Sequence, residues 1–242
     1  MDIYYKAGVI SLIGRIEDNH THRHHAIQVV VARKPFSAFI DNKTIQSDSI
    51  IIPANVPHRI DAGNCHTFLV EPESQLGNML QTGLLKKDLF HLNNEIKSGL
   101  LELSGSQEQF WADFKLVMAK VSATNLSLSP DPRISQVLEY VQEKMAKHQG
   151  EDLTLAKALA LSNISESRFL HLFSEQVGIS WRQYLLWNKL LAAGRLALTG
   201  YNLTDSAYMA GFSDAAHLSR TFKKMFGFSP AKILQHSRFI QS

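Results

Sequence analysis

The sequence predicts an α+β protein, in which a small N-terminal β domain with helices precedes an all-α C-terminal domain. Short β-branched runs fill residues 1 to about 75, whereas apolar residues recur at helical spacing in the rest of the chain. The segment from Leu153 to Leu234 also contains one pattern twice, 49 positions apart. Each copy has the form short helix, tight turn, second helix, which predicts two helix-turn-helix units joined by a connecting helix.

The composition favours a globular protein of two domains. The chain has 242 residues, of which 45% are hydrophobic and 19% are charged. It contains no run of 18 apolar residues, and no basic segment precedes an apolar run at the N-terminus, so we expect neither a membrane span nor a signal peptide. The single cysteine, Cys65, cannot form an internal disulfide. These features predict a cytoplasmic protein with no membrane partner.

The charge is distributed unevenly along the chain. Residues 133–242 hold 13 Lys and Arg against 8 Asp and Glu, whereas residues 1–132 hold 12 against 14. A basic C-terminal half favours a polyanionic partner, with a solvated surface as the alternative.

The N-terminal strands are predicted from four short apolar runs, Ile27–Val31, Phe36–Ile40, Ser49–Pro53 and Thr67–Val70. The turn-forming residues 41–43 separate the second run from the third. Several short strands at close spacing predict a sandwich or a small barrel.

Helical spacing begins near residue 75. Apolar residues at this spacing are Leu76, Met79, Leu80, Leu84 and Leu85, followed by a stripe of Phe110, Phe114, Val117 and Val121. We expect the stripe to close the core of its own domain; the alternative is a helix that pairs with its copy in a dimer.

A segment rich in Ser, Asn and Pro separates the two halves. It predicts a first domain at residues 1–122, a linker at 123–132 and a second domain at 133–242, which begins with an amphipathic helix that ends near Gly150.

The first copy of the repeat is predicted as a helix over Leu153–Leu161, a turn at Ser162-Asn163 and a second helix that Ser165 caps and that ends near Val177. Asparagine tolerates the left-handed backbone that such a turn requires. A serine side chain at a helix start accepts a bond from a free backbone N–H.

The second copy is predicted as a helix over Leu203–Ala210, a turn at Gly211 and a helix from the Asp214 cap to Phe226. A connecting helix over Ser180–Leu198 would be about 28 Å long. Successive major-groove faces on one side of DNA lie roughly 34 Å apart, so one chain would present both second helices to adjacent turns.

The connecting helix and the second copy carry a specific set of residues, namely Lys189-Leu190, Ala193, Ala207, Gly211-Phe212, Leu218, Arg220-Thr221-Phe222, Lys223-Lys224, Phe226-Gly227 and Ser229-Pro230. In these residues the C-terminal part of the chain resembles the DNA-binding domain of the AraC/XylS family of bacterial transcription regulators. Two positions depart from the family pattern, because His171 stands where an arginine is usual and Ser206 where an isoleucine or a similar residue is usual.

Helix geometry predicts which side chains face DNA. Phe169, Phe173 and Val177 in the first copy, and Leu218, Phe222 and Phe226 in the second, would face the core. The opposite faces carry Glu166, Ser167, Leu170 and His171, and Ala215, Ala216, Ser219 and Arg220, with Arg168 and His217 in flanking positions. Arg220 and His171 are the leading base readers, because both side chains can donate to purine acceptors.

Other residues are predicted to contact the DNA backbone. We expect phosphate contacts from Arg182, Lys223, Lys224 and the backbone N–H groups near Ser229. The alternatives are a phosphate contact or an internal ion pair for Arg220, and a solvated side chain for His171 and for each lysine.

Histidines concentrate in the N-terminal half. His20, His22 and His24 would share one face of a strand, and His58 follows the third apolar run. This order resembles the cupin barrel, which many family members use as an effector and dimerisation domain. The usual glutamate is absent, since Gln28 stands near its place.

We assign His20, His22, His24 and His58 to effector contact. Metal binding and a structural role stay open as alternatives. The sequence itself predicts no resident metal and no cofactor.

The resemblance implies a non-enzymatic regulator that binds double-stranded promoter DNA and a small-molecule effector. RNA polymerase and a second copy, paired through the N-terminal domain, are further expected partners. The rival hypothesis is a metalloenzyme that uses the four histidines, but the sequence shows no paired carboxylates, nucleophile elbow or phosphate loop to support catalysis.

Overall fold

The computed structural model describes residues 1–240, except residues 7, 19, 84–91, 121–130, 228, 232–233 and 235–236. The chain divides into two compact units, residues 1–127 with 224–242, and residues 128–223. The first contains an antiparallel sheet with helices and the second is helical, which confirms the predicted α+β class. Among the described residues, no helix is long and apolar enough to cross a membrane.

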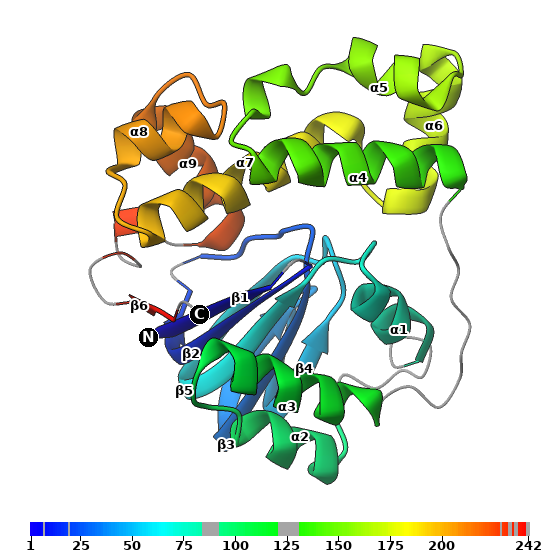
Figure 1. Ribbon diagram of the computed structural model, residues 1–242. Coiled ribbons are helices and arrows are strands. Elements are labelled where there is room, and N and C mark those ends of the chain that lie inside the picture. The colour runs from blue at the N-terminus through cyan, green and yellow to red at the C-terminus, as the bar shows by residue number, and fades with distance from the viewer. Residues whose placement is uncertain are drawn as a thin grey trace. The chain divides into compact units, whose positions relative to one another are not determined.

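The first unit is built on one six-stranded sheet with the order β4-β3-β5-β2-β1-β6. Neighbouring strands are antiparallel except for β1 and β6, which are parallel. The strands are β1 (Asp2–Lys6), β2 (Val9–Glu17), β3 (Ile27–Ile40), β4 (Lys43–Ile52), β5 (His58–Val70) and β6 (Arg238–Phe239) (Figure 1).

The two predicted strands in residues 27–40 are one strand, β3. Its pairing shifts register between Val31 and Phe36, where Pro35 lies, because proline cannot donate a ladder hydrogen bond and is tolerated at such a bulge. The predicted turn after β3 is confirmed, since Asp41 and Asn42 have positive φ angles of 46° and 64°.

Both faces of this sheet are buried. Val29 and Val31 belong to one apolar cluster, and Val30 and Ala32 belong to the other. Among the described residues, the buried members of the second cluster come from β2, β3, β4 and β5 alone, so the sheet curls and packs on itself. This explains why β3 begins as a continuous apolar run instead of an alternating one.

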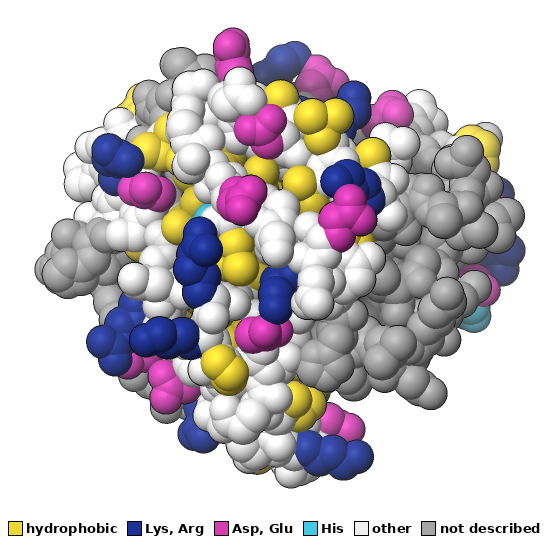
Figure 2. Space-filling model, turned by 90° about the horizontal axis from the view of Figure 1, so that it is seen from below, with side chains coloured by type: hydrophobic (Ala, Val, Ile, Leu, Met, Phe, Trp, Pro, Cys, Tyr) yellow, Lys and Arg dark blue, Asp and Glu magenta, His cyan; other side chains and the backbone are white. Residues whose placement is uncertain are grey.

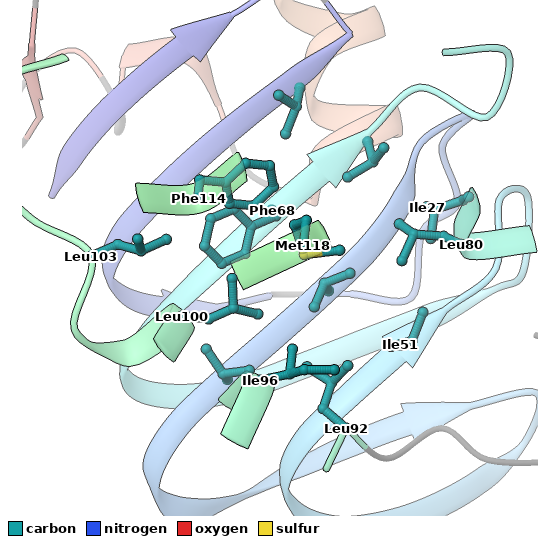
Figure 3. Packing of buried hydrophobic residues seen from close by; sticks show 14 of the residues in the cluster. Ile27, Ile51, Phe68, Leu80, Leu92, Ile96, Leu100, Leu103, Phe114 and Met118 are labelled. Atoms are coloured by element: carbon teal, nitrogen blue, oxygen red, sulfur yellow. The ribbon is translucent and has the colours of Figure 1, made fainter. Parts of the chain in front are cut away.

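The first cluster is covered by helices. α2 (Asn94–Leu101) and α3 (Gln107–Ala119) lie against the sheet, and α1 (Gln75–Gly83) adds Leu80. Figure 3 shows Phe68 of β5 close to Phe114 and Met118 of α3; the Phe68 and Phe114 rings stack with their centroids 5.0 Å apart.

The apolar stripe on α3 therefore closes the core of its own unit. Phe110 and Phe114 are buried, so the alternative use of these two side chains as a dimer seam is wrong. Val121, Leu84, Leu85 and the predicted linker up to residue 130 lie outside the described residues.

The second unit begins with α4 and continues as two helix-turn-helix copies. Its elements are α4 (Pro132–Ala146), the short 3₁₀ helix η1 (Gly150–Asp152), α5 (Leu155–Ser162), α6 (Glu166–Val177), α7 (Trp181–Leu198), α8 (Leu203–Met209) and α9 (Ala215–Phe226), of which α9 belongs to this unit up to Lys223. The predicted helices of the repeat are confirmed with shifts of one or two residues at their ends.

The connecting helix α7 starts with a reciprocal cap. Ser180 and Gln183 each bond the other's backbone at the helix start. Trp181 then packs against Phe169 and Phe173 of α6, with ring centroids 5.6 and 5.3 Å apart. α7 thus provides the apolar surface on which the first copy is assembled.

Candidate DNA-binding surface and histidine cluster

The first helix-turn-helix copy has the predicted turn but not the predicted cap. Asn163 is left-handed, with φ of 50°, and ends α5. Ser165 precedes α6, but its side chain makes no capping hydrogen bond; its carbonyl accepts from the Phe169 N–H at 2.8 Å. The prediction of a side-chain cap by Ser165 was therefore wrong; the exposed hydroxyl can bond to solvent instead.

The two faces of α6 differ as predicted. Phe169, Phe173 and Val177 are buried. The residues assigned to the opposite face are exposed (Glu166, Ser167, Arg168 and His171) or half-buried (Leu170).

An acidic side chain accompanies the histidine on α6. His171 Nδ1 lies 3.8 Å from Glu175 Oε2, one helical turn further along, and both side chains are mostly exposed. Any positive charge on His171 is thus partly neutralised within the helix itself.

The second copy has a fully formed cap. Asp214 Oδ1 accepts the His217 N–H at 2.6 Å, and Asp214 Oδ2 accepts the Ser213 hydroxyl at 3.0 Å. The backbone N–H of His217 is the main reason that the pKa of Asp214 lies below its usual value. The carboxylate therefore stays ionised at the positive end of the helix dipole.

Ser213 is a residue that sequence reasoning missed. Its Oγ lies 3.3 Å from His217 Nδ1, and the His217 ring meets Phe212 edge-on at 5.3 Å. These contacts hold the imidazole at the start of α9. A serine and an aspartate directly before a helix, with a histidine four residues after the serine, form the sequence signal that identifies this arrangement.

The exposed face of α9 carries cations that form no ion pair with a described residue, although Arg220 interacts electrostatically with the Asp214 carboxylate at the helix start. Arg220, Lys223 and Lys224 are exposed, and none of them forms an ion pair with any described residue. The internal ion pair considered for Arg220 is therefore not seen in the described part of the chain. The other residues assigned to this face are exposed (Ala216 and His217) or half-buried (Ala215 and Ser219), while Leu218, Phe222 and Phe226 are buried as predicted.

α7 holds the second turn in place. Lys189 Nζ donates to the Gly211 carbonyl at 2.9 Å, and burial lowers the pKa of this lysine. Gly211 has φ of 82°, and a Cβ there would lie 3.2 Å from the backbone of Gly150. Lys189, one of the family-pattern residues, thus has a structural role.

The remaining predicted phosphate contacts are exposed. Arg182 lies on α7, and Ser229 follows α9. By contrast, the face of the molecule drawn in Figure 2 has acidic and basic side chains interspersed, an arrangement that does not suit a polyanion.

In the first unit the structure brings three of the four predicted histidines together. His22, His24 and His58, called here the histidine cluster, each offer a ring nitrogen within 4.8 Å of the others. Paired backbone hydrogen bonds of 2.9 Å between His22 and His58 hold the segment around His22 against the start of β5. The predicted strand through residues 20–24 is wrong, because this segment makes a single isolated bridge.

His20 does not join the cluster through its ring. Its backbone carbonyl instead contacts His22 Nδ1 at 3.3 Å. Burial lowers the pKa of each histidine in the cluster, that of His22 to about 4. The three imidazoles are therefore neutral at physiological pH.

A separate open pocket of about 450 Å³ lies on the same unit. Its lining is mostly polar or charged, and consists of Glu17, Asp18, Ser37, Ala38, Phe39, Thr44, Arg59 and Asp61. No histidine of the cluster lines it, although Asp18 Oδ2 lies 3.8 Å from His22 Nδ1.

Comparison with known proteins agrees with this architecture. Residues 155–236 match the model of a helix-turn-helix domain. A probable transcriptional regulator, LumQ from Photobacterium leiognathi, is 23% identical over 90% of this chain and 93% of its own. The arabinose operon regulatory protein of Escherichia coli is 33% identical over 49% of this chain and 40% of its own.

A solved structure shares the fold over nearly the whole chain. Apo ToxT from Vibrio cholerae superposes with a TM-score of 0.61 at 12% identity and covers 96% of this chain and 98% of its own. The repeated unit, the residue pattern of its second copy and these matches together show that the C-terminal part of the chain is similar to the helix-turn-helix region of AraC-type transcription regulators.

Proposed function

We propose that α6 and α9 are the two recognition helices of a sequence-specific transcription regulator and read adjacent major-groove segments of one promoter. The observation that carries the proposal is the repeat itself: two helices in register, each with a buried aromatic face and a polar outer face, joined by α7. α7 has 18 residues and is about 27 Å long. That length is compatible with adjacent turns of B-DNA.

Within this proposal the two helices have different side chains for base contact. Arg220 on α9 is exposed and forms no ion pair with a described residue, which supports a bidentate contact to guanine. His171 is the equivalent residue on α6. The flanking positions Arg168 and His217, and the small residues around them, complete the two groove-facing surfaces.

Backbone contact is assigned to other cations. Arg182, Lys223, Lys224 and the N–H groups near Ser229 would bind phosphates and set the position of the protein on the duplex. These contacts carry no sequence information, so their loss affects every DNA sequence similarly.

The predicted domains would have separate roles. Residues 133–242 would bind DNA, 123–132 would connect, and 1–122 would bind a small-molecule effector and pair two copies. Two ToxT structures are described as bound to an unsaturated fatty acid and to a naphthalenyl butenoic acid. They support binding of a small-molecule effector by a protein of this fold. The histidine cluster, with His20 beside it, is the proposed effector site.

The biological setting follows from promoter binding. The protein would act in the cytoplasm, contact RNA polymerase and regulate without catalysis of its own. The relatives named above are themselves described as regulators, which favours this role over an enzyme.

The test uses the full-length protein. Genomic fragments retained by the purified chain are sequenced, and a retained site is then footprinted. We expect protection of two segments about one helical turn apart, and an affinity that falls steeply with salt. Protection of one segment alone, or equal retention of all fragments, would contradict the proposal.

A further inference from the structure

Four ligand groups converge in the histidine cluster. The three imidazoles are almost fully enclosed, with 8%, 4% and 1% of His22, His24 and His58 exposed. Gln28 of β3 adds a fourth group, since its Oε1 lies 2.9 Å from Nε2 of His24 and 2.9 Å from Nε2 of His58.

Backbone carbonyls decide which nitrogen of each ring carries the hydrogen. A carbonyl oxygen only accepts hydrogen bonds, so the ring nitrogen that faces it must be protonated. In a neutral imidazole the other nitrogen then keeps its lone pair. The contacts are His22 Nδ1 to the His20 carbonyl at 3.3 Å, His24 Nδ1 to the Ala26 carbonyl at 3.1 Å and His58 Nδ1 to the Val56 carbonyl at 2.8 Å.

The centre of the cluster is therefore rich in lone pairs. Nε2 of His24 and Nε2 of His58 are acceptors, and the oxygen of Gln28 that faces them is an acceptor too. A cation among them would resolve this conflict for all these groups together. Rotation of the Gln28 amide, which places its N–H groups there, is the alternative without a cation.

The surroundings resemble the outer shell of a metal site. Ligand histidines usually donate their second ring nitrogen to a carbonyl or a carboxylate, which orients the ring. All three rings of the cluster have that contact, and His22 Nδ1 also lies 3.8 Å from the buried Asp18 carboxylate.

We propose that His22, His24, His58 and Gln28 bind one divalent transition-metal ion per chain. Imidazole nitrogen suits zinc, nickel and cobalt, whereas magnesium and calcium require mainly oxygen ligands. All four ligands are neutral, so the bound ion keeps its full positive charge. This proposal rests on the effector site proposed above and names a metal ion as part of that site. Metal binding can nevertheless be measured without DNA.

The test titrates the full-length, chelator-treated protein with Co²⁺, whose visible absorption reports its coordination geometry. We expect one equivalent to produce the intense bands of a low-coordinate site with nitrogen ligands, and Zn²⁺ to abolish them by displacement. The temperature of unfolding should rise with Zn²⁺ and not with Mg²⁺. The absence of stoichiometric cobalt binding would overturn the proposal.

Variants separate the site from adventitious binding. His58→Gln should lose the cobalt spectrum, whereas His25→Gln, buried in a pair with Glu73, should keep it. An unchanged spectrum in His58→Gln would refute the assignment.

Gln28→Glu provides a test that misfolding cannot imitate. A carboxylate in place of the amide adds a negative charge beside the ion, so the affinity for Co²⁺ should rise by about tenfold or more, although the metal-free protein becomes less stable. Unchanged or weaker binding in a folded Gln28→Glu protein would show that the amide does not face a metal.

DNA retention by the same samples keeps the two proposals distinguishable. Cobalt binding together with footprints that do not depend on metal would support the metal site and remove its role as effector. Normal footprints without cobalt binding would overturn the metal site and leave the proposed function intact.

Discussion

The two helix-turn-helix copies share one fold but differ in how their charges are arranged. In the first, the imidazole of His171 lies 3.8 Å from Glu175, and the helix starts without a side-chain cap. In the second, Asp214 caps the helix and Arg220, Lys223 and Lys224 form no ion pair with described residues. The buried aromatic faces are nevertheless equivalent. The fold was thus retained by the core, while the outer faces diverged.

This difference indicates how the copies would divide the work. An arginine is always charged, and one that forms no ion pair can contact a base or a phosphate. A histidine whose ring lies near a carboxylate presents less net positive charge to DNA. We therefore expect α9 to supply most of the DNA affinity and α6 to adjust it.

The largest effect is expected from Arg220→Ala. Loss of a bidentate base contact should weaken binding to the promoter by about 1 to 3 kcal/mol, with a smaller loss on random duplex. His171→Ala should cost clearly less. Fluorescence anisotropy with both duplexes measures these affinities, with Lys223→Ala as the control that weakens both equally. Equal losses for Arg220→Ala on the two duplexes would show a phosphate contact only.

The sequence predicted the second unit better than the first. The 49-residue repeat located four helices, because helix periodicity, turn residues and caps are all local signals. The side-chain cap at Ser165 was wrongly predicted because a serine at the start of a helix can form such a cap but does not always do so. The lack of an ion pair between Arg220 and any described residue and the acid beside His171 depend on side-chain conformations that a pattern of residues does not specify.

The histidine cluster shows the limit of the same reasoning in the first unit. Spacing of two residues suggested a strand and therefore included His20 with His22 and His24. The pairing that excludes His20 is with His58, and it depends on contacts between residues far apart in the chain. Gln28 was noticed only as a substitute for an absent glutamate, although its amide lies at the centre of the cluster.

The second prediction compares the helix caps. Asp214→Ala should lower the unfolding temperature by about 2 to 4 °C, because it removes the bond to the His217 N–H, whereas Ser165→Ala should lower it by about 1 °C or less. Differential scanning calorimetry of the full chain measures both. Equal shifts would mean that the caps are equivalent in solution.

The contribution of Asp214 should also depend on pH. The pKa of this carboxyl is lowered in the folded protein, so its stabilising effect is present above the pKa of the unfolded chain and is lost as the pH falls through the folded value. The difference between wild type and Asp214→Ala should therefore shrink as the pH is lowered below about 4. A difference that grows on acidification would contradict this assignment.

The third prediction restores a cation to the first copy. His171→Arg should strengthen promoter binding by about fivefold, because a permanently charged side chain then occupies the position equivalent to Arg220. Gln136→Arg on α4 adds the same charge outside the recognition helices and serves as the control. If the two variants bind the promoter with equal affinity, the gain results from the added net charge and not from the position of residue 171.

The smallest effect is expected from Glu175→Gln. Removal of an exposed carboxylate from α6 should roughly double the affinity at low salt, and the gain should vanish at high salt because exposed charges are screened. Glu143→Gln is the matched control, because Glu143 of α4 also forms an ion pair one helical turn away, with Lys147.

The gain from Glu175→Gln should be larger in the His171→Arg background, because there the Glu175 carboxylate offsets the full positive charge of the introduced arginine. Additive effects of the two substitutions would show that Glu175 repels DNA directly and does not act through residue 171.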